Sequence, residues 1–168
     1  MTDMRGGPAA WARAAAWCAA VVAPSAEAQD PVVDDAAVEA CFEGAAVGVT
    51  EPPCLGAAAG ACQTRPGGAS TIGIVECIVA ETAAWDAILN REYRATREAL
   101  TGTGAAGIDV GSALLDAQRA WIAFRDAECA LSYARWQDGT LRSVVGANCV
   151  LVMTAVRALE LRDMRGEG

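Results

Sequence analysis

The side chains that could do chemistry in this sequence are carboxylates, cysteines, arginines and tryptophans, because the 168 residues include no histidine. Without an imidazole base, nucleophilic catalysis of the Ser-His and Cys-His types is excluded. Asp126 and Glu128 are a carboxylate pair of the kind that glycoside hydrolysis uses. Helix positions two apart do not converge on one point, so we interpret these two residues as surface carboxylates.

Three tryptophans offer a second kind of chemistry, the stacking of a sugar ring on an aromatic shelf. Trp85, Trp121 and Trp136 all lie in segments with helical periodicity. Tryptophans on the apolar stripe of a helical bundle are more often core residues, because each buries a large apolar surface. The sequence favours the core interpretation and leaves the shelf open.

Arg125 is the most unusual residue of its helical face, since it lies one turn from Trp121 and one turn from Cys129. An arginine among large apolar side chains is expected to be partly buried and paired with a carboxylate, for which Asp86 and Glu81 are the candidates. Two roles stay open for it, a structural clamp between helices and an arginine that binds a ligand.

Three long segments position these residues. Apolar side chains recur every three or four positions across residues 70–100, 112–137 and 141–164, which predicts three amphipathic helices, the first starting at Ser70 or Thr71. The glycine-rich stretch 101–107 and the turn at 138–140 separate them. Ser112 is placed to cap the second of these helices, and Glu81 and Glu92 are expected on faces of the first that lie outside its apolar stripe.

Two shorter helices are predicted before them, over residues 32–46 and 53–61, with Pro53 opening the second. Both segments are rich in alanine and glycine and would bury little apolar surface alone, so covalent links there would stabilise them. No segment alternates strictly between apolar and polar residues as a half-buried strand does. The predicted fold class is therefore all-α, an antiparallel three-helix core with a small disulfide-stapled N-terminal helical cap.

The first 28 residues resemble a secretory signal peptide. Arg5 and Arg13 supply positive charge, residues 14–23 form a short apolar run, and residues 26–28 match a cleavage pattern. The apolar run is about half of the roughly 20 residues that cross a bilayer. We therefore expect a periplasmic or secreted protein that begins near Gln29 and has no membrane association once the signal is cleaved.

The composition limits the class of partner. The net charge is −8, and every basic residue is an arginine. An acidic surface disfavours nucleic acids and anionic membranes as partners. It favours a cationic protein partner, although simple solubility also accounts for such a charge.

Removal of the signal would take Cys18 away and leave six cysteines, an even number that predicts disulfides in an exported chain: Cys41, Cys54, Cys62, Cys77, Cys129 and Cys149. A zinc site is not expected, because histidine and close Cys-x-x-Cys pairs are lacking. Each successive pair of cysteines flanks a predicted turn, so we expect pairing in chain order. Each bridge should stabilise the fold by about 2–4 kcal/mol.

The pattern of residues 77–161 resembles the LprI-like lysozyme-inhibitor family. In that family, one helix carries an aspartate, Leu-Asn and a tyrosine, the next carries Gln-Arg-x-Trp and Arg-Asp-x-x-Cys, and the third carries a cysteine followed by threonine and arginine. Cys62 and Cys77 resemble the family's earlier cysteine pair. The residues that carry the resemblance, interpreted as scaffold, are Trp85, Asp86, Leu89, Asn90, Tyr93, Gln118, Arg119, Trp121, Arg125, Asp126, Thr154 and Arg157.

The resemblance implies a helical envelope protein without a cofactor, some of whose relatives bind and inhibit lysozyme. It also suggests a division into a signal peptide (residues 1–28), a cysteine-containing helical cap (29–69) and an LprI-like helical domain (70–168). Two functions are open: a lysozyme inhibitor, which is not an enzyme, and a structural or stress-related envelope protein with another partner. A hydrolase is disfavoured because no base or metal site is apparent.

Overall fold

A computed structural model describes residues 32–104 and 107–167, and the predicted signal peptide lies outside these ranges. The described chain is helical throughout and contains no strand, which confirms the predicted all-α class. The elements are α1 (Asp35–Gly44), α2 (Ala57–Gln63), α3 (Thr71–Leu100), α4 (Val110–Arg135), α5 (Leu141–Met164) and a short 3-10 helix η1 (Arg165–Glu167).

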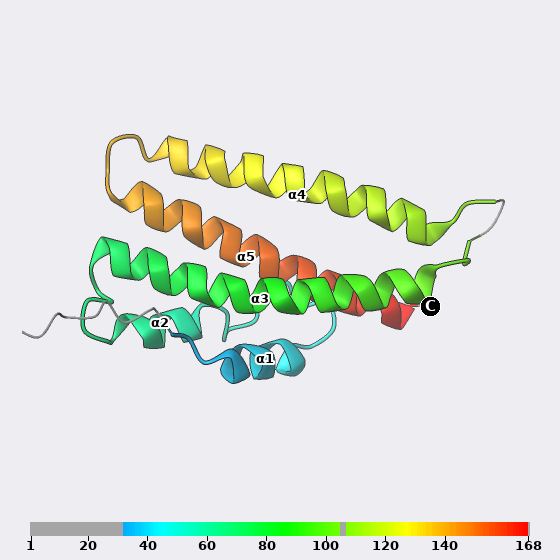
Figure 1. Ribbon diagram of the computed structural model, residues 1–168, viewed down its shortest axis with the longest axis horizontal. Coiled ribbons are helices and arrows are strands. Elements are labelled where there is room, and N and C mark those ends of the chain that lie inside the picture. The colour runs from blue at the N-terminus through cyan, green and yellow to red at the C-terminus, as the bar shows by residue number, and fades with distance from the viewer. Residues whose placement is uncertain (1–31, 105–106, 168) are drawn as a thin grey trace, which may run out of the picture.

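The long helix α3 organises the molecule, since α5 packs along it and α1 and α2 lie against another side of it (Figure 1). α4 runs antiparallel to α5 and packs mainly on that helix, with a smaller contact to α3. Because α3 is covered on more than one side, Glu81 and Glu92 are buried, at 1% and 4% exposure. Our expectation that these two carboxylates lie outside the buried face was therefore wrong.

The side chain of Glu81, on α3, caps the N-terminus of helix α2. Its two carboxylate oxygens accept hydrogen bonds from the backbone N–H groups of Gly56 (2.8 Å) and Ala59 (2.6 Å), and the indole of Trp85 donates to one of them (3.2 Å). These N–H groups belong to the first turn of the helix, where no intrahelical partner exists. Helix α2 consequently starts after Gly56, and the predicted start at Pro53 was wrong.

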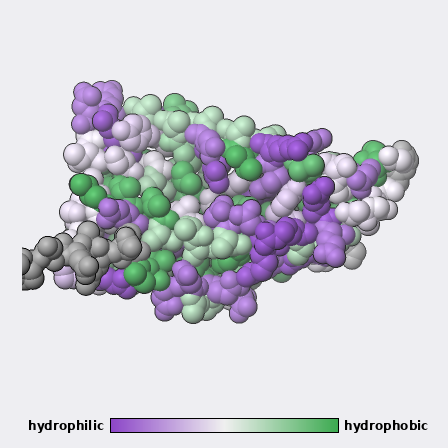
Figure 2. Space-filling view, viewed as in Figure 1, coloured by the Kyte–Doolittle hydropathy of each residue, from purple (hydrophilic) through white to green (hydrophobic). Residues whose placement is uncertain are grey.

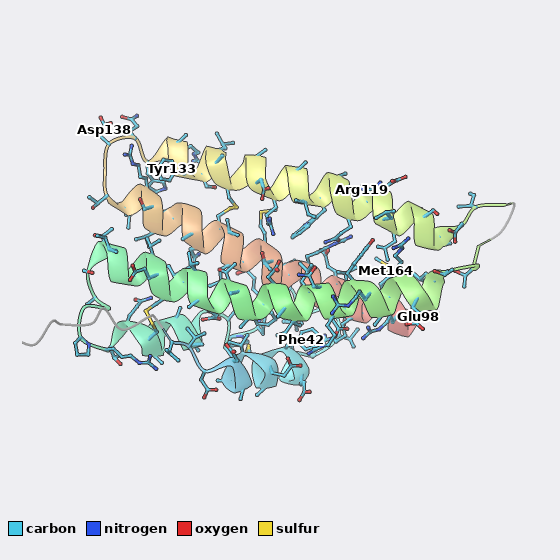
Figure 3. The ribbon with its side chains drawn as sticks, in the orientation of Figure 1. Phe42, Glu98, Arg119, Tyr133, Asp138 and Met164 are labelled. Atoms are coloured by element: carbon cyan, nitrogen blue, oxygen red, sulfur yellow. A yellow bond between two sulfur atoms is a disulfide. The ribbon has the colours of Figure 1, made fainter. Side chains whose placement is uncertain are left out.

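The α1 helix is fastened to α3 by both apolar and charged contacts. The ring of Phe42 on α1 (labelled in Figure 3) meets that of Trp85 edge-on, with 6.3 Å between ring centres. Arg91 on α3 forms a two-pronged ion pair with Glu39, with N–O distances of 2.9 and 2.7 Å. Trp85 is fully buried, and Val38, Cys41 and Phe42 of α1 belong to the same hydrophobic core. The N-terminal helical cap is therefore part of the core.

Three disulfides join the cysteines in chain order, as their spacing predicts: Cys41–Cys54, Cys62–Cys77 and Cys129–Cys149. The first fixes α1 to the turn before α2, and the second fixes α2 to α3. The third links α4 to α5 with a Cα–Cα distance of 5.4 Å. Each of the outer helices is thus covalently attached to a neighbour.

The N-cap of helix α4 lies three residues earlier than predicted. The N-cap is Asp109, whose carboxylate accepts the backbone N–H of Ser112 at 3.2 Å and its hydroxyl at 2.7 Å. Ser112 therefore supports the cap from inside the first turn and does not form it. An aspartate at this position also complements the positive end of the helix dipole.

Helix α5 is long and apolar enough to cross a membrane by length and composition, and it is the one such helix among the described residues. In this structure it serves as a core helix, with five of its apolar residues buried against its neighbours: Leu151, Ala155, Ala158, Leu159 and Leu161.

The C-terminal end of α5 is held to the loop after α1 by the half-buried Asp163. Asp163 accepts the backbone N–H of Gly48 at 2.8 Å and pairs with Arg162 at 2.8 Å. Burial opposes ionisation of Asp163, but the hydrogen bonds and charge of Arg162, together with the Gly48 N–H, outweigh it and lower the pKa below its ordinary value. The ionised form is therefore the one that stabilises the fold.

We expect Asp163→Asn to lower the free energy of unfolding by about 1 kcal/mol at pH 7. A lowered folded-state pKa gives stability above the unfolded value of about 3.9 that is lost as pH falls through the folded value. The difference between variant and wild type should therefore shrink near pH 3, as measured by urea unfolding at both pH values. The control, Asp116→Asn, changes an exposed carboxylate and should leave stability unaltered; an equal effect of Asp163→Asn at both pH values would contradict the assignment.

Candidate functional site

An open cleft lies between the middle of α3 and the first half of α4. Its volume is about 240 Å³. Figure 3 labels Arg119 on the α4 side of this region. The lining residues come from both helices and are Asp86, Leu89, Asn90, Tyr93, Leu115, Gln118, Arg119, Trp121, Ile122 and Arg125.

The wall on α4 is built around Trp121. The guanidinium of Arg125 lies over its ring at 5.2 Å from the ring centre, and that of Arg157 from α5 lies over it at 5.9 Å. Arg157 also donates from Nε to Oε1 of Gln118 at 3.0 Å, so the buried amide of Gln118 is fixed in one orientation. These contacts hold the aromatic ring in place, and a rigid aromatic surface is a favourable anchor for a partner.

Arg125 pairs with its neighbour Asp126 at 2.9 Å, and not with Asp86 or Glu81 as expected. Glu81 is turned to the other side of α3, where it accepts the N–H groups at the start of α2. Asp86 instead accepts a hydrogen bond from the side-chain amide of Asn90 at 2.8 Å. The arginine therefore stacks on the cleft wall and does not clamp α3 to α4.

The wall on α3 contributes polar groups. Asn90 is exposed at the rim, and Asp86 and Tyr93 are half-buried beside it. The hydroxyl of Tyr93 is buried and has no hydrogen-bond partner within residues 32–104 and 107–167, and the same holds for the hydroxyl of Thr154 in the core. Buried polar groups normally find a partner, so Tyr93 is the group in this cleft most suited to bind one.

Eight of the twelve family-motif residues line this cleft, and the other four lie elsewhere. Asp126 and Arg157 support its wall from outside, through Arg125 and Gln118 respectively. Trp85 and Thr154 are fully buried in the core. Sequence reasoning missed Leu115 and Ile122, which lie seven residues apart on one side of α4, a spacing that could have revealed them.

The other candidates for chemistry do not converge. Trp85 is fully buried and Trp136 is 50% exposed in a different region from Trp121, so the three rings form no shared shelf. Asp126 and Glu128 are both exposed on α4. Within the described residues there is no cluster of three or more histidine, cysteine or acidic side chains able to hold a metal ion.

A family model described as "Lysozyme inhibitor LprI" matches residues 62–161. This range covers more than half of the chain and includes both walls of the cleft. The chain belongs to the LprI lysozyme-inhibitor family. The LprI match begins at Cys62 in α2, so α1 and the Cys41–Cys54 bridge lie outside it.

One curated protein is also similar to the chain. The "Uncharacterized protein R02472" of Rhizobium meliloti (strain 1021) is 31% identical over 121 residues, which span 66% of this chain and 87% of the relative. No solved structure matches the chain.

Proposed function

We propose that this LprI-family chain is an exported, non-enzymatic protein that binds a lysozyme and inhibits it, with the cleft between α3 and α4 as the centre of the contact surface. The main support for this proposal is that most of the family-motif residues line an open cleft. A purely structural motif would be expected to pack into the core. Asn90 and Arg119 are instead exposed at the rim of the cleft, and Trp121 presents a fixed ring within it.

Charge supports a cationic partner. The chain carries −8 overall, and residues 32–64 contain five acidic residues and no basic one: Asp34, Asp35, Glu39, Glu43 and Glu51. A negative surface accelerates the encounter with a strongly basic enzyme such as lysozyme. The N-terminal cap would therefore attract the enzyme, and the cleft would supply the specific contact.

Covalent stapling supports both the location and the rigidity of the site. Three disulfides are typical of a protein that works outside the reducing cytosol, in the periplasm or the medium. A rigid surface loses little conformational entropy on binding, which favours affinity. On this proposal residues 1–28 are the export signal, residues 29–69 the acidic cap and residues 70–168 the lysozyme-binding domain.

Lysis of bacterial cell walls by chicken-type lysozyme tests the proposal, with the purified oxidised protein titrated at low salt and at 0.5 M salt. We expect half-inhibition at near-stoichiometric ratios and at micromolar protein or below, at both salt concentrations. At 0.5 M the Debye length is only about 4–5 Å, so inhibition by charge attraction alone would disappear. Inhibition that vanishes with salt, or none at all, would favour a structural envelope role with another partner.

A further inference from the structure

The outer face of α4 carries a continuous apolar stripe that no described part of the chain covers. Phe124 and Leu131 are 59% and 54% exposed and lie seven residues apart. Figure 2 shows green, apolar residues along the left part of the upper edge, where Figure 1 places the C-terminal half of α4. Five exposed alanines continue the line at alternating spacings of three and four: Ala113, Ala117, Ala120, Ala127 and Ala134.

This spacing is that of the seam between two paired helices. The opposite face of α4 is already used, since Leu114, Gln118 and Cys129 are buried against α5 and the cleft. Phe124 and Leu131 add two large side chains to this apolar line. The helix therefore has a second face suited to packing against another helix.

We infer that this stripe is a self-association surface on which α4 of a second copy packs in the antiparallel direction. A two-fold axis makes such a contact self-complementary, because each copy offers the same patch to the other. The inference goes beyond lysozyme binding and does not depend on it, since the stripe and the cleft lie on different sides of α4.

The sizes of the stripe residues favour one antiparallel register. When Phe124 is set opposite Ala120 of the second copy, Leu131 falls opposite Ala113, and Ala127 opposite Ala117. Each large side chain then meets an alanine, which lets two helices approach closely without a clash. The centre of this register lies near residue 122, which is also the midpoint of α4, so the two helices overlap over their whole length of 26 residues.

The charge of α4 also permits contact between two copies. Within residues 110–135 three arginines and three acidic residues balance, whereas the whole chain carries −8. α4 is thus a neutral surface on an acidic protein, where a second acidic copy meets the least repulsion.

One pair of helices is a small interface, below the roughly 1,200 Å² of stable complexes, so the dimer should be weak. We expect a dissociation constant of about 1–100 µM. Sedimentation velocity of the oxidised protein, from about 5 to 500 µM, should therefore show the mass rising from one chain to two. Leu131→Glu should remain monomeric throughout, because it places a charge in the seam.

Ile122→Glu is the matched control, since Ile122 is also a partly exposed apolar residue of α4 but lies on the opposite side of the helix, in the cleft. It should dimerise as the wild type does, and circular dichroism should show that both variants keep their helices. A wild type that stays monomeric at 500 µM would overturn the inference. So would a dimer that survives Leu131→Glu, or one that is lost in Ile122→Glu alone.

A cysteine placed at the axis tests the register. Ala123 lies close to the two-fold axis, on the flank of the seam, so Ala123→Cys should give a covalent dimer with a short bis-maleimide cross-linker. Ala134→Cys lies about 35 Å from its symmetry mate in this register and should not cross-link. A non-reducing peptide map identifies the new bridge; cross-linking through residue 134, or no cross-link through residue 123, would overturn the antiparallel arrangement.

Discussion

Glu81→Ala should lower the free energy of unfolding by about 3–5 kcal/mol, the largest effect that we expect from one substitution on a polar residue. The carboxylate is 1% exposed and accepts three hydrogen bonds, two from the start of α2 and one from Trp85. Its removal leaves those buried donors without an acceptor, at a cost of about 1–3 kcal/mol for each unsatisfied group, partly relieved by local rearrangement. Urea unfolding at pH 7 measures the change.

Two controls separate this role from helix propensity. Glu76→Ala makes the same change at an exposed position of α3 and should alter stability by less than about 0.5 kcal/mol. Glu81→Gln keeps one acceptor oxygen and should cost less than Glu81→Ala. A loss below about 1 kcal/mol for Glu81→Ala would show that α2 does not depend on this carboxylate.

Asn90→Trp should raise the half-inhibitory concentration for lysozyme at least about tenfold while the fold stays intact. Asn90 is exposed at the rim of the cleft, which has a volume of about 240 Å³. A tryptophan ring at this position would fill much of that volume. Blocking the centre of an interface has effects of this size, because the central residues carry most of the binding energy. The assay is cell-wall lysis with each variant titrated at 0.15 M salt.

Ala87→Trp is the matched control for that variant. Ala87 is an exposed residue of the same helix that does not line the cleft, and the new side chain is identical. It should inhibit as the wild type does. Equal inhibition by wild type and Asn90→Trp would place the contact surface elsewhere on the molecule.

The helices and the disulfides were predictable from sequence because both are governed by local spacing. The predicted range of α5, residues 141–164, agrees with the structure, and α3 begins at Thr71, one of its two predicted starts. Cys129 and Cys149 lie ten residues on either side of the turn at Gly139, and two antiparallel helices bring such positions together. Periodicity and turn residues carry this information without any tertiary contact.

The partners of buried charges were not predictable, because they depend on which helix covers which face. Glu81 lies outside the apolar stripe of α3, and only the docking of α2 on that side gives it a role. Arg125 was expected to reach across to α3, but Asp126 is closer and already pairs with it. In both cases a tertiary arrangement decided between chemically equivalent partners.

The sequence identified many of the residues that line the cleft but did not predict the cleft itself. Its polar residues, such as Asn90 and Arg119, were recognised through the family motif but interpreted as scaffold. Their meeting in one opening depends on α4 packing mainly on α5 and leaving a gap beside α3, a feature of helix packing that periodicity does not specify.

The most direct test of lysozyme binding through the cleft is calorimetric titration of lysozyme with the oxidised protein at 0.15 M and 0.5 M salt. We predict saturable binding of one lysozyme per chain, with a dissociation constant of about 1 µM or lower at both salt concentrations. The heat should be lost in Asn90→Trp and kept in Ala87→Trp. No saturable heat from the wild type, or binding that Asn90→Trp leaves unchanged, would contradict lysozyme binding through the cleft.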